Sequence, residues 1–274
     1  MTAPAIRVSR DWLALREAVD AAARASGLVD HLRRRRPAAG RWVIHDLGGG
    51  TGAMGRWLAP LLPGPQHWVV HDLDADLLEV AAAHAAGPAA DGTIVTLETK
   101  RSDITRLHPG DLAGATLITA SALLDLLTED ELAELIAVCA GSRCPMLLTL
   151  SVVGDVELTP ADRLDRPVGA AFDAHQRRVT ERGRLLGPDA VALAIEQCSQ
   201  LGAEVLVRPS PWRLGASQAD LTAEWFTGWV GAACEQEVEL AAEAELYTRR
   251  RLAQAATGEL AVTVDHADLL VSPR

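Results

Sequence analysis

The sequence predicts an α/β protein with a doubly wound parallel sheet and helices on both faces. Strand-like apolar segments alternate with segments of helical periodicity along residues 42–153, which is the pattern of a parallel sheet with crossover helices. A glycine-rich turn follows the first strand, and a carboxylate ends the second. With 274 residues, the chain is long enough to bury the core of one large domain.

The first strand, WVIHDL at residues 42–47, leads into the glycines at positions 48, 49, 50 and 52. Glycine tolerates backbone angles and close approaches that other residues do not, so a sharp turn is expected here. Residues 54–62 then have helical character and end before Pro63. A strand, a glycine turn and a helix start bring free backbone N–H groups to one point, where a ligand can lie against the main chain.

The second strand, residues 67–74, ends in carboxylates, and Asp72 follows Gly52 by 20 residues. A carboxylate at the tip of the second strand can accept both hydroxyl groups of a ribose. These two segments together indicate a cofactor that contains a nucleoside.

The glycine pattern fits two families of nucleotide-binding turn. GTGAMG at residues 50–55 fits the dinucleotide pattern G-x-G-x-x-G, whereas GGGTG at residues 48–52 fits G-x-G-x-G with Asp46 two positions ahead. With this carboxylate, the chain resembles the class I S-adenosylmethionine-dependent methyltransferases. A pyrophosphate would be repelled by Asp46, but an amino acid that carries a sulfonium would not.

The resemblance implies a seven-stranded Rossmann-like sheet of strand order 3-2-1-4-5-7-6, S-adenosylmethionine as cofactor and S-adenosylhomocysteine as product. It places Asp46 near the amino-acid part of the cofactor and Asp103 near the adenine, although both carboxylates could instead be satisfied within loops. The cofactor-binding residues predicted in this way are Asp46, Gly48, Gly50, Thr51, Gly52, Asp72, Leu73, Ser102, Asp103, Ile104 and Ser121.

The remaining strands are predicted at residues 93–97, 115–120, 145–153, 203–208 and 260–264. Thr128 and Glu131 form a T-x-x-E capping box that starts the helix after the fourth strand. Residues 120–126 therefore lie at the carboxyl edge of the sheet, where open α/β sheets bind their ligands. Asp125 in this loop faces either the site or the solvent, and the sequence does not separate the two.

The segment after the fifth strand contains FDAHQRR at residues 172–178, and the chain here resembles a bacterial branch of the same family with F-x-x-H-Q-R-R. We expect His175 as the first candidate for a catalytic general base and Asp125 as the second. Arg177 and Arg178 are candidates for binding a substrate carboxylate or phosphate. A structural, hydrogen-bonded role for His175 is equally open.

About fifty residues separate the last two strands, where the family normally has a short hairpin. Helices predicted at 220–232 and 235–256 indicate a helical cap over the pocket, or two packing helices without ligand contact. Trp212 is the tryptophan we expect in the pocket, whereas Trp225 and Trp229 have the spacing of a core stripe.

The chain is thus predicted to be a single domain over residues 1–274. Within it, residues 1–39 form an N-terminal helical segment, 40–210 the cofactor-binding core, 211–258 the helical insertion, and 259–274 the last strand.

The composition excludes several classes of function. A formal net charge of −11 argues against nucleic acid as a partner. There is no apolar run long enough to span a membrane, no signal peptide, and no cysteine or histidine spacing typical of a metal site. We therefore expect a cytoplasmic protein with reduced cysteines and no metal, either a monomer or a homodimer.

The function predicted from the sequence is S-adenosylmethionine-dependent O- or N-methylation of a small-molecule metabolite. Two alternatives stay open at this point. A NAD(P)-dependent oxidoreductase would use the same glycine-rich loop, and a non-catalytic S-adenosylmethionine-binding protein would retain the cofactor site without turnover.

Overall fold

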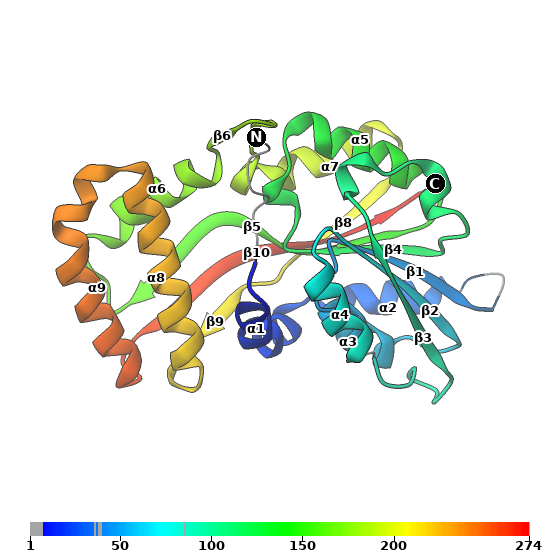
Figure 1. The fold of residues 1–274 in the computed structure, drawn as a ribbon, viewed down its shortest axis with the longest axis horizontal. Coiled ribbons are helices and arrows are strands. Elements are labelled where there is room, and N and C mark those ends of the chain that lie inside the picture. The colour runs from blue at the N-terminus through cyan, green and yellow to red at the C-terminus, as the bar shows by residue number, and fades with distance from the viewer. Residues whose placement is uncertain (1–7, 36, 38–39, 85, 274) are drawn as a thin grey trace.

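The computed structural model describes residues 8–35, 37, 40–84 and 86–273. Parts of the predicted N-terminal segment (residues 1–7, 36 and 38–39) and residue 274 of the predicted last segment lie outside the described residues. The main sheet has the strand order β3-β2-β1-β4-β5-β10-β8, and β10 runs antiparallel to both of its neighbours. This is the predicted order 3-2-1-4-5-7-6, so the fold prediction is confirmed (Figure 1).

The longer strands are β1 (Trp42–Leu47), β2 (Gln66–Asp72), β3 (Val95–Arg101), β4 (Leu117–Ser121), β5 (Met146–Thr159), β8 (Glu204–Pro209), β9 (Trp212–Leu214) and β10 (Ala261–Ser272). The helices are α1 (Arg10–Ala23), α2 (Ser26–Arg34), α3 (Ala53–Leu58), α4 (Ala75–Ala83), α5 (Glu129–Gly141), α6 (Asp165–Gln176), α7 (Ala190–Gln200), α8 (Ala219–Gln236) and α9 (Ala241–Ala256).

Helices lie on both faces of the sheet, as predicted. On one face, the apolar residues of α2 and α3 pack against β1, β2 and β4 around Trp42 and Trp68. On the other face, α5 and α7 pack against β4, β5 and β10. The predicted capping box begins α5, because the Thr128 hydroxyl accepts from the Glu131 N–H while the Glu131 carboxylate accepts from the Thr128 N–H.

Several elements are longer or shorter than the sequence predicts. The last strand, predicted at residues 260–264, continues to Ser272, and the fifth continues beyond residue 153 to Thr159. The α-helix predicted over 54–62 ends at Leu58 and continues as a short 3-10 turn. The last strand was predicted too short because His266 and Asp268 interrupt its apolar pattern, although both side chains are buried.

The paired strands β5 and β10 extend beyond the rest of the sheet, and a group of helices packs around their extended ends. We define this group, α6, α8 and α9, as the helical lobe, which lies at one end of the molecule in Figure 1. Its core includes Phe226, Trp229 and Tyr247 together with Trp212 from β9, and Trp225 stacks on Trp229 with ring centroids 5.3 Å apart. The tryptophan pair therefore belongs to the core of the lobe. No helix of the described residues is long and apolar enough to cross a membrane.

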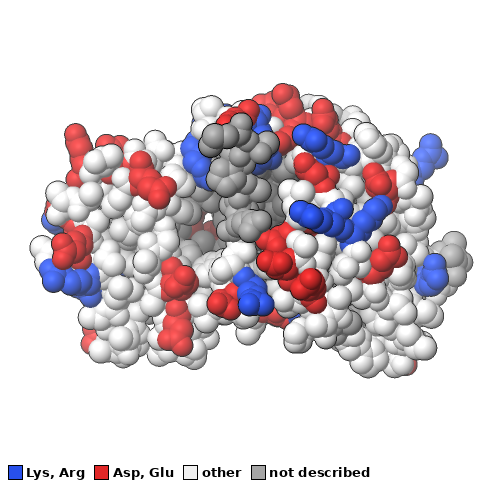
Figure 2. Space-filling view, in the orientation of Figure 1, with Lys and Arg blue, Asp and Glu red and all other residues white. Residues whose placement is uncertain are grey.

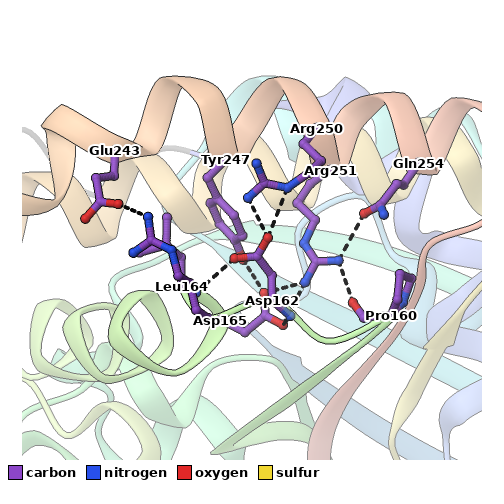
Figure 3. Close-up of polar contacts among 10 residues, drawn as sticks. Pro160, Asp162, Leu164, Asp165, Glu243, Tyr247, Arg250, Arg251 and Gln254 are labelled. Atoms are coloured by element: carbon purple, nitrogen blue, oxygen red, sulfur yellow. Dashed lines mark hydrogen bonds and ion pairs between the residues drawn. The ribbon is translucent and has the colours of Figure 1, made fainter.

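A buried ion pair joins α9 to the first residue of α6 (Figure 3). The Arg251 guanidinium is 1% exposed and donates to both carboxylate oxygens of Asp165, at 2.6 and 2.7 Å. It also donates to the Pro160 carbonyl at 2.6 Å, and the Tyr247 hydroxyl donates to Asp165 at 2.6 Å. A buried charge is destabilising unless a partner of opposite charge compensates it. The pair therefore stabilises the packing of α9 against α6.

We predict that Asp165→Ala lowers the free energy of unfolding by about 3–5 kcal/mol, because it leaves the Arg251 charge buried without its partner. Denaturant unfolding followed by circular dichroism measures the loss. Glu245→Ala is the control, since Glu245 is exposed and its ion pair with Arg249 is long, at 3.8 Å, and therefore weak. A loss below 1 kcal/mol for Asp165→Ala would show that the ion pair does not hold the lobe.

Candidate functional site

The glycine turn after β1 has the geometry that the sequence predicts. Gly48, Gly50 and Gly52 have φ values of +61°, +52° and +79°, which residues with a side chain rarely adopt. The Gly49 N–H donates to the His71 carbonyl at 3.0 Å, which holds the turn against the end of β2. The turn leads directly into α3, whose first residue is Ala53.

Asp46 lies beneath this turn and is completely buried. One carboxylate oxygen accepts from the Thr119 hydroxyl at 2.6 Å, while the other, Oδ2, has no hydrogen-bond partner among the described residues. A Cβ atom on Gly49 would lie 2.5 Å from Oδ2, so the turn can close over the carboxylate only with glycine there. Burial raises the pKa of Asp46 to about 7, against the opposing effects of the Thr119 hydrogen bond and the Arg24 charge.

Arg24 is a candidate site residue that the sequence analysis did not identify. It follows α1, and its side chain is 5% exposed. Nη2 donates to the Ser121 hydroxyl at 3.1 Å, but Nε and Nη1 have no partner among the described residues. Burial lowers the pKa of this guanidinium, and the charges of Asp20 and Asp46 act in the opposite direction.

The position of Arg24 depends on tertiary contacts, and no local motif marks it. Its guanidinium carbon lies 5.2 Å from the centre of the Trp57 ring on α3, within the range of a cation–π contact. The short link between α1 and α2 is held in place by Asp268 of β10, whose carboxylate accepts from the Ala25 N–H at 2.7 Å. The same carboxylate accepts from the Leu150 N–H at 2.8 Å, where β5 carries a φ of +55°.

The predicted ribose and adenine residues come together at the ends of β2 and β3. Asp72 accepts from the Gly50 N–H at 2.8 Å and from the Asp74 N–H at 2.9 Å, so this carboxylate joins the glycine turn to the end of β2. The Ser102 N–H donates to the Asp72 carbonyl at 2.9 Å. Leu73, beside Asp72, is 49% exposed and therefore open to a ligand.

Asp103 and Ile104 follow directly after Ser102. The Asp103 carboxylate accepts from the Thr105 N–H at 3.0 Å and from the Thr105 hydroxyl at 2.7 Å, which caps a short 3-10 turn. Its second oxygen lies 3.6 Å from the exposed Arg106 side chain. Ile104 packs into the core below, while Thr51 is buried in the glycine turn.

The two candidates for a general base lie in different surroundings. Asp125 is half-buried in the short turn Leu124–Leu126 after β4, and burial raises its pKa while the Arg16 and Arg178 charges oppose that change. His175 lies at the end of α6 with Nε2 3.2 Å from the Glu235 carboxylate of α8. The structure therefore places His175 at a contact within the helical lobe.

Arg177 and Arg178, the predicted anion ligands, also differ. Arg177 donates twice to Asp189, at 2.7 Å each, and once to the Asp173 carbonyl. Arg178 donates to the His175 carbonyl at 3.1 Å and carries the charge that acts on Asp125. The Arg177 guanidinium is thus occupied by an ion pair, whereas the contacts of Arg178 are with His175.

Trp212, the predicted pocket tryptophan, is 2% exposed in β9. Its indole N–H donates to Asp20 at 2.9 Å, and the Arg16 guanidinium carbon lies 4.7 Å from its ring centre. The ring also packs 5.5 Å from that of His266. Trp212 thus joins α1 to the base of the lobe.

The described residues contain no group of three or more histidine, cysteine or acidic side chains that could hold a metal ion. Asp46 and Arg24 instead bring opposite charges close enough to act on each other, and each retains polar atoms without a partner among the described residues. This arrangement fits a ligand that carries an ammonium and a carboxylate group.

Comparisons with known proteins give structural similarity alone. No family model matches the sequence. No curated protein matches it either. Solved structures include the YcgJ protein of Bacillus subtilis, with 11% identity, 91% of this chain and 100% of that chain covered, and a TM-score of 0.48.

Two further solved structures of low sequence identity are similar to this chain. The cyclopropane synthase MmaA2 of Mycobacterium tuberculosis has 15% identity over 90% of this chain and 83% of its own, with a TM-score of 0.46. An O-methyltransferase family protein of Burkholderia thailandensis has 21% identity over 73% of this chain and 57% of its own, with a TM-score of 0.42. The strand order and the glycine turn of this chain are those of the class I methyltransferase fold.

Proposed function

We propose that the protein is an S-adenosylmethionine-dependent methyltransferase that acts on a small-molecule metabolite. The observation that carries this proposal is the buried pair of Asp46 and Arg24, whose unpartnered polar atoms lie beside a glycine turn of the class I fold. Buried polar groups are normally hydrogen-bonded, so unpartnered atoms on two residues whose charges act on each other support a missing partner.

The chemistry of the two side chains specifies that partner. A carboxylate oxygen accepts from an ammonium group, and a guanidinium donates to a carboxylate. The amino-acid part of S-adenosylmethionine carries both groups. A pyrophosphate carries only negative charge, and Asp46 beneath the glycine turn would repel it when ionised.

The second half of the site suits the nucleoside of the same cofactor. Each Asp72 oxygen already accepts one hydrogen bond, Oδ2 from Gly50 of the glycine turn and Oδ1 from Asp74, and each retains a lone pair for a ribose hydroxyl. Leu73 offers an exposed apolar side chain beside it, and Ser102, Asp103 and Ile104 form the adjoining loop. We assign these residues, with Gly48, Gly50, Thr51, Gly52 and Ser121, to the cofactor site.

When bound, the cofactor supplies a sulfonium group that makes its methyl group ready for transfer. The protein then aligns the acceptor atom and excludes water. A general base is needed only where the acceptor must lose a proton, as in O-methylation or methylation of an ammonium. We propose Asp125 and His175 for this role, and Arg178 and Trp212 as the residues on the acceptor side.

A metabolite suits the surface better than a nucleic acid does. The formal net charge is −11, and Figure 2 shows acidic and basic side chains interspersed over the face in view. A nucleic-acid partner needs a concentrated positive charge to neutralise its phosphates. We also propose that the protein is cytoplasmic and that it is either a monomer or a homodimer.

Two other functions use the same turn and make different predictions. The function of a NAD(P)-dependent oxidoreductase would not explain the unpartnered polar atoms of Asp46 and Arg24. A non-catalytic S-adenosylmethionine-binding protein retains the cofactor site but gives no transfer. Incubation with cofactor labelled in the methyl group and a metabolite extract separates this last possibility from an enzyme.

Calorimetric titration with S-adenosylhomocysteine, NAD and NADP tests the proposal. We predict micromolar binding of S-adenosylhomocysteine alone. Arg24→Met should weaken that binding by about 2 kcal/mol, because it removes the charged donors from a buried site. Arg249→Met, on the exposed face of α9, is the matched control and should leave affinity unchanged. Binding of NAD in place of S-adenosylhomocysteine would reverse the assignment of the glycine turn.

The affinity for S-adenosylhomocysteine should also depend on pH through Asp46. Its pKa in the free protein is raised to about 7, so below that pH the carboxyl carries a proton that an arriving ammonium must displace. We predict that affinity falls by roughly tenfold between pH 7.5 and pH 6, and that Asp46→Asn binds weakly and without this dependence. Equal pH profiles for the wild type and Asp46→Asn would remove Asp46 from the site.

A further inference from the structure

Arg16 on α1 carries a guanidinium group that is largely enclosed but makes a single hydrogen bond within the described chain. Its Nε donates to the Asp20 carboxylate at 2.9 Å, and its side chain is 13% exposed. Nη1 and Nη2, which together carry four N–H donors, have no partner among the described residues. These two nitrogens form the end of a guanidinium that can bind an oxyanion with two parallel hydrogen bonds.

Two other arginines use every nitrogen of the guanidinium, although they are less enclosed. Arg56, whose side chain is 23% exposed, donates from Nε, Nη1 and Nη2. Arg177, at 26%, does the same. Because enclosed polar groups are normally hydrogen-bonded, the free donors of Arg16 point to a partner that the described chain does not supply.

Asp20 and two tryptophans hold the Arg16 guanidinium in place. The Asp20 carboxylate accepts from Arg16 with one oxygen and from the Trp212 indole N–H with the other, at 2.9 Å each. The guanidinium carbon lies 4.7 Å from the centre of the Trp212 ring and 5.9 Å from that of Trp12. These contacts leave the Nη donors unused. A side chain fixed in this way loses little conformational freedom when it binds a ligand.

The α1 helix places Arg16 between the cofactor turn and the helical lobe (Figure 1). Leu13 faces the turn, since a Cβ atom on Gly50 would lie 3.2 Å from its side chain. Trp12 packs against the core of the lobe. The Arg16 charge also acts on Asp125, which follows β4. A molecule bound at Arg16 would therefore lie beside the cofactor turn and near a proposed general base.

Arg16 and Arg24 cannot both bind the carboxylate of one cofactor. Both side chains leave guanidinium nitrogens without a partner among the described residues. Eight residues separate them, which corresponds to about 12 Å along a helix. The two oxygens of a carboxylate lie much closer together than that. If Arg24 binds the cofactor carboxylate, Arg16 is left for a second anionic group.

We propose that Arg16 binds an oxyanion of the methyl acceptor, so that the acceptor is a metabolite with a carboxylate or a phosphate group. The oxyanion lies at the Nη1 and Nη2 end of the guanidinium, and the atom to be methylated lies on the side toward the cofactor turn. That the anion belongs to the methyl acceptor rests on the proposed function. The binding of an oxyanion by Arg16 does not.

Titration of the unmodified protein with benzoate, phenyl phosphate and benzamide tests the oxyanion site. Nitrogen-15 NMR of the tryptophan indole N–H groups follows binding through Trp12 and Trp212, which contact Arg16. We expect saturable shifts of these signals with at least one of the two anions, and none with the neutral benzamide. Shifts with neither anion, or equal shifts with benzamide, would overturn the proposal.

Arg16→Gln should weaken binding of the anion at least about tenfold, because two hydrogen bonds to a charged group are lost. Arg10→Gln, on the exposed first turn of the same helix, is the matched control and should bind as the wild type does. An unchanged affinity for the anion in folded Arg16→Gln would overturn the assignment of Arg16.

A metabolite extract separated on an anion exchanger tests whether the anion is part of the acceptor. Incubation of each fraction with cofactor labelled in the methyl group should give transfer from the retained, anionic fraction. Phosphatase treatment of that fraction beforehand should abolish transfer if the anion is a phosphate and preserve it if the anion is a carboxylate. Arg16→Gln should need at least about ten times more of the fraction for half-maximal rate. Its affinity for S-adenosylhomocysteine should stay nearly unchanged, whereas a purely structural role would change both.

The outcomes separate this proposal from the proposed function. Transfer from the unretained fraction alone would overturn an anionic acceptor while the methyltransferase assignment stands. Failure of the unmodified protein to bind S-adenosylhomocysteine would overturn the proposed function and the acceptor assignment with it. The titration with benzoate and phenyl phosphate would still decide whether Arg16 binds an oxyanion.

Discussion

The carboxylate of Asp46 imposes the constraint on which the rest of the site depends. It is completely buried, one oxygen is bonded to Thr119, and the other presses against Gly49 without a partner. Burying such a group costs free energy unless a partner compensates. Arg24 brings an opposite charge, itself buried and incompletely bonded, to the same place. Under the proposed function, these two groups bind the ammonium and the carboxylate of the cofactor.

Long strands connect this site to the helical lobe. The β5 strand passes the site at Leu150, where the backbone is in the left-handed region, and continues to Thr159 beside β10. Asp268 stabilises the irregular point by accepting from the N–H groups of both Leu150 and Ala25. Ala25 directly follows Arg24. The Asp268 carboxylate therefore holds both the backbone of β5 at Leu150 and the backbone next to Arg24.

Local signals in the sequence predicted the fold well. The glycine run, the Thr128 capping box and the alternation of strands and helices each act over a few residues, and the structure contains all three. Arg24 and Asp268 were missed because their contacts are with segments far apart in the chain. The extent of β10 was missed for a related reason, since its polar residues are buried by tertiary packing. The assigned roles of His175, Arg177, Arg178 and Trp212 stay predictions.

The measurement that tests this account most directly compares S-adenosylhomocysteine with 5′-methylthioadenosine by calorimetry. The two share the adenosine and the sulfur, but only the first carries the ammonium and carboxylate groups. If Asp46 and Arg24 are built for those groups, methylthioadenosine should bind at least about 100-fold more weakly, the equivalent of two lost charged hydrogen bonds. Equal affinities would contradict the account, because the buried charges would then have no part in binding the cofactor.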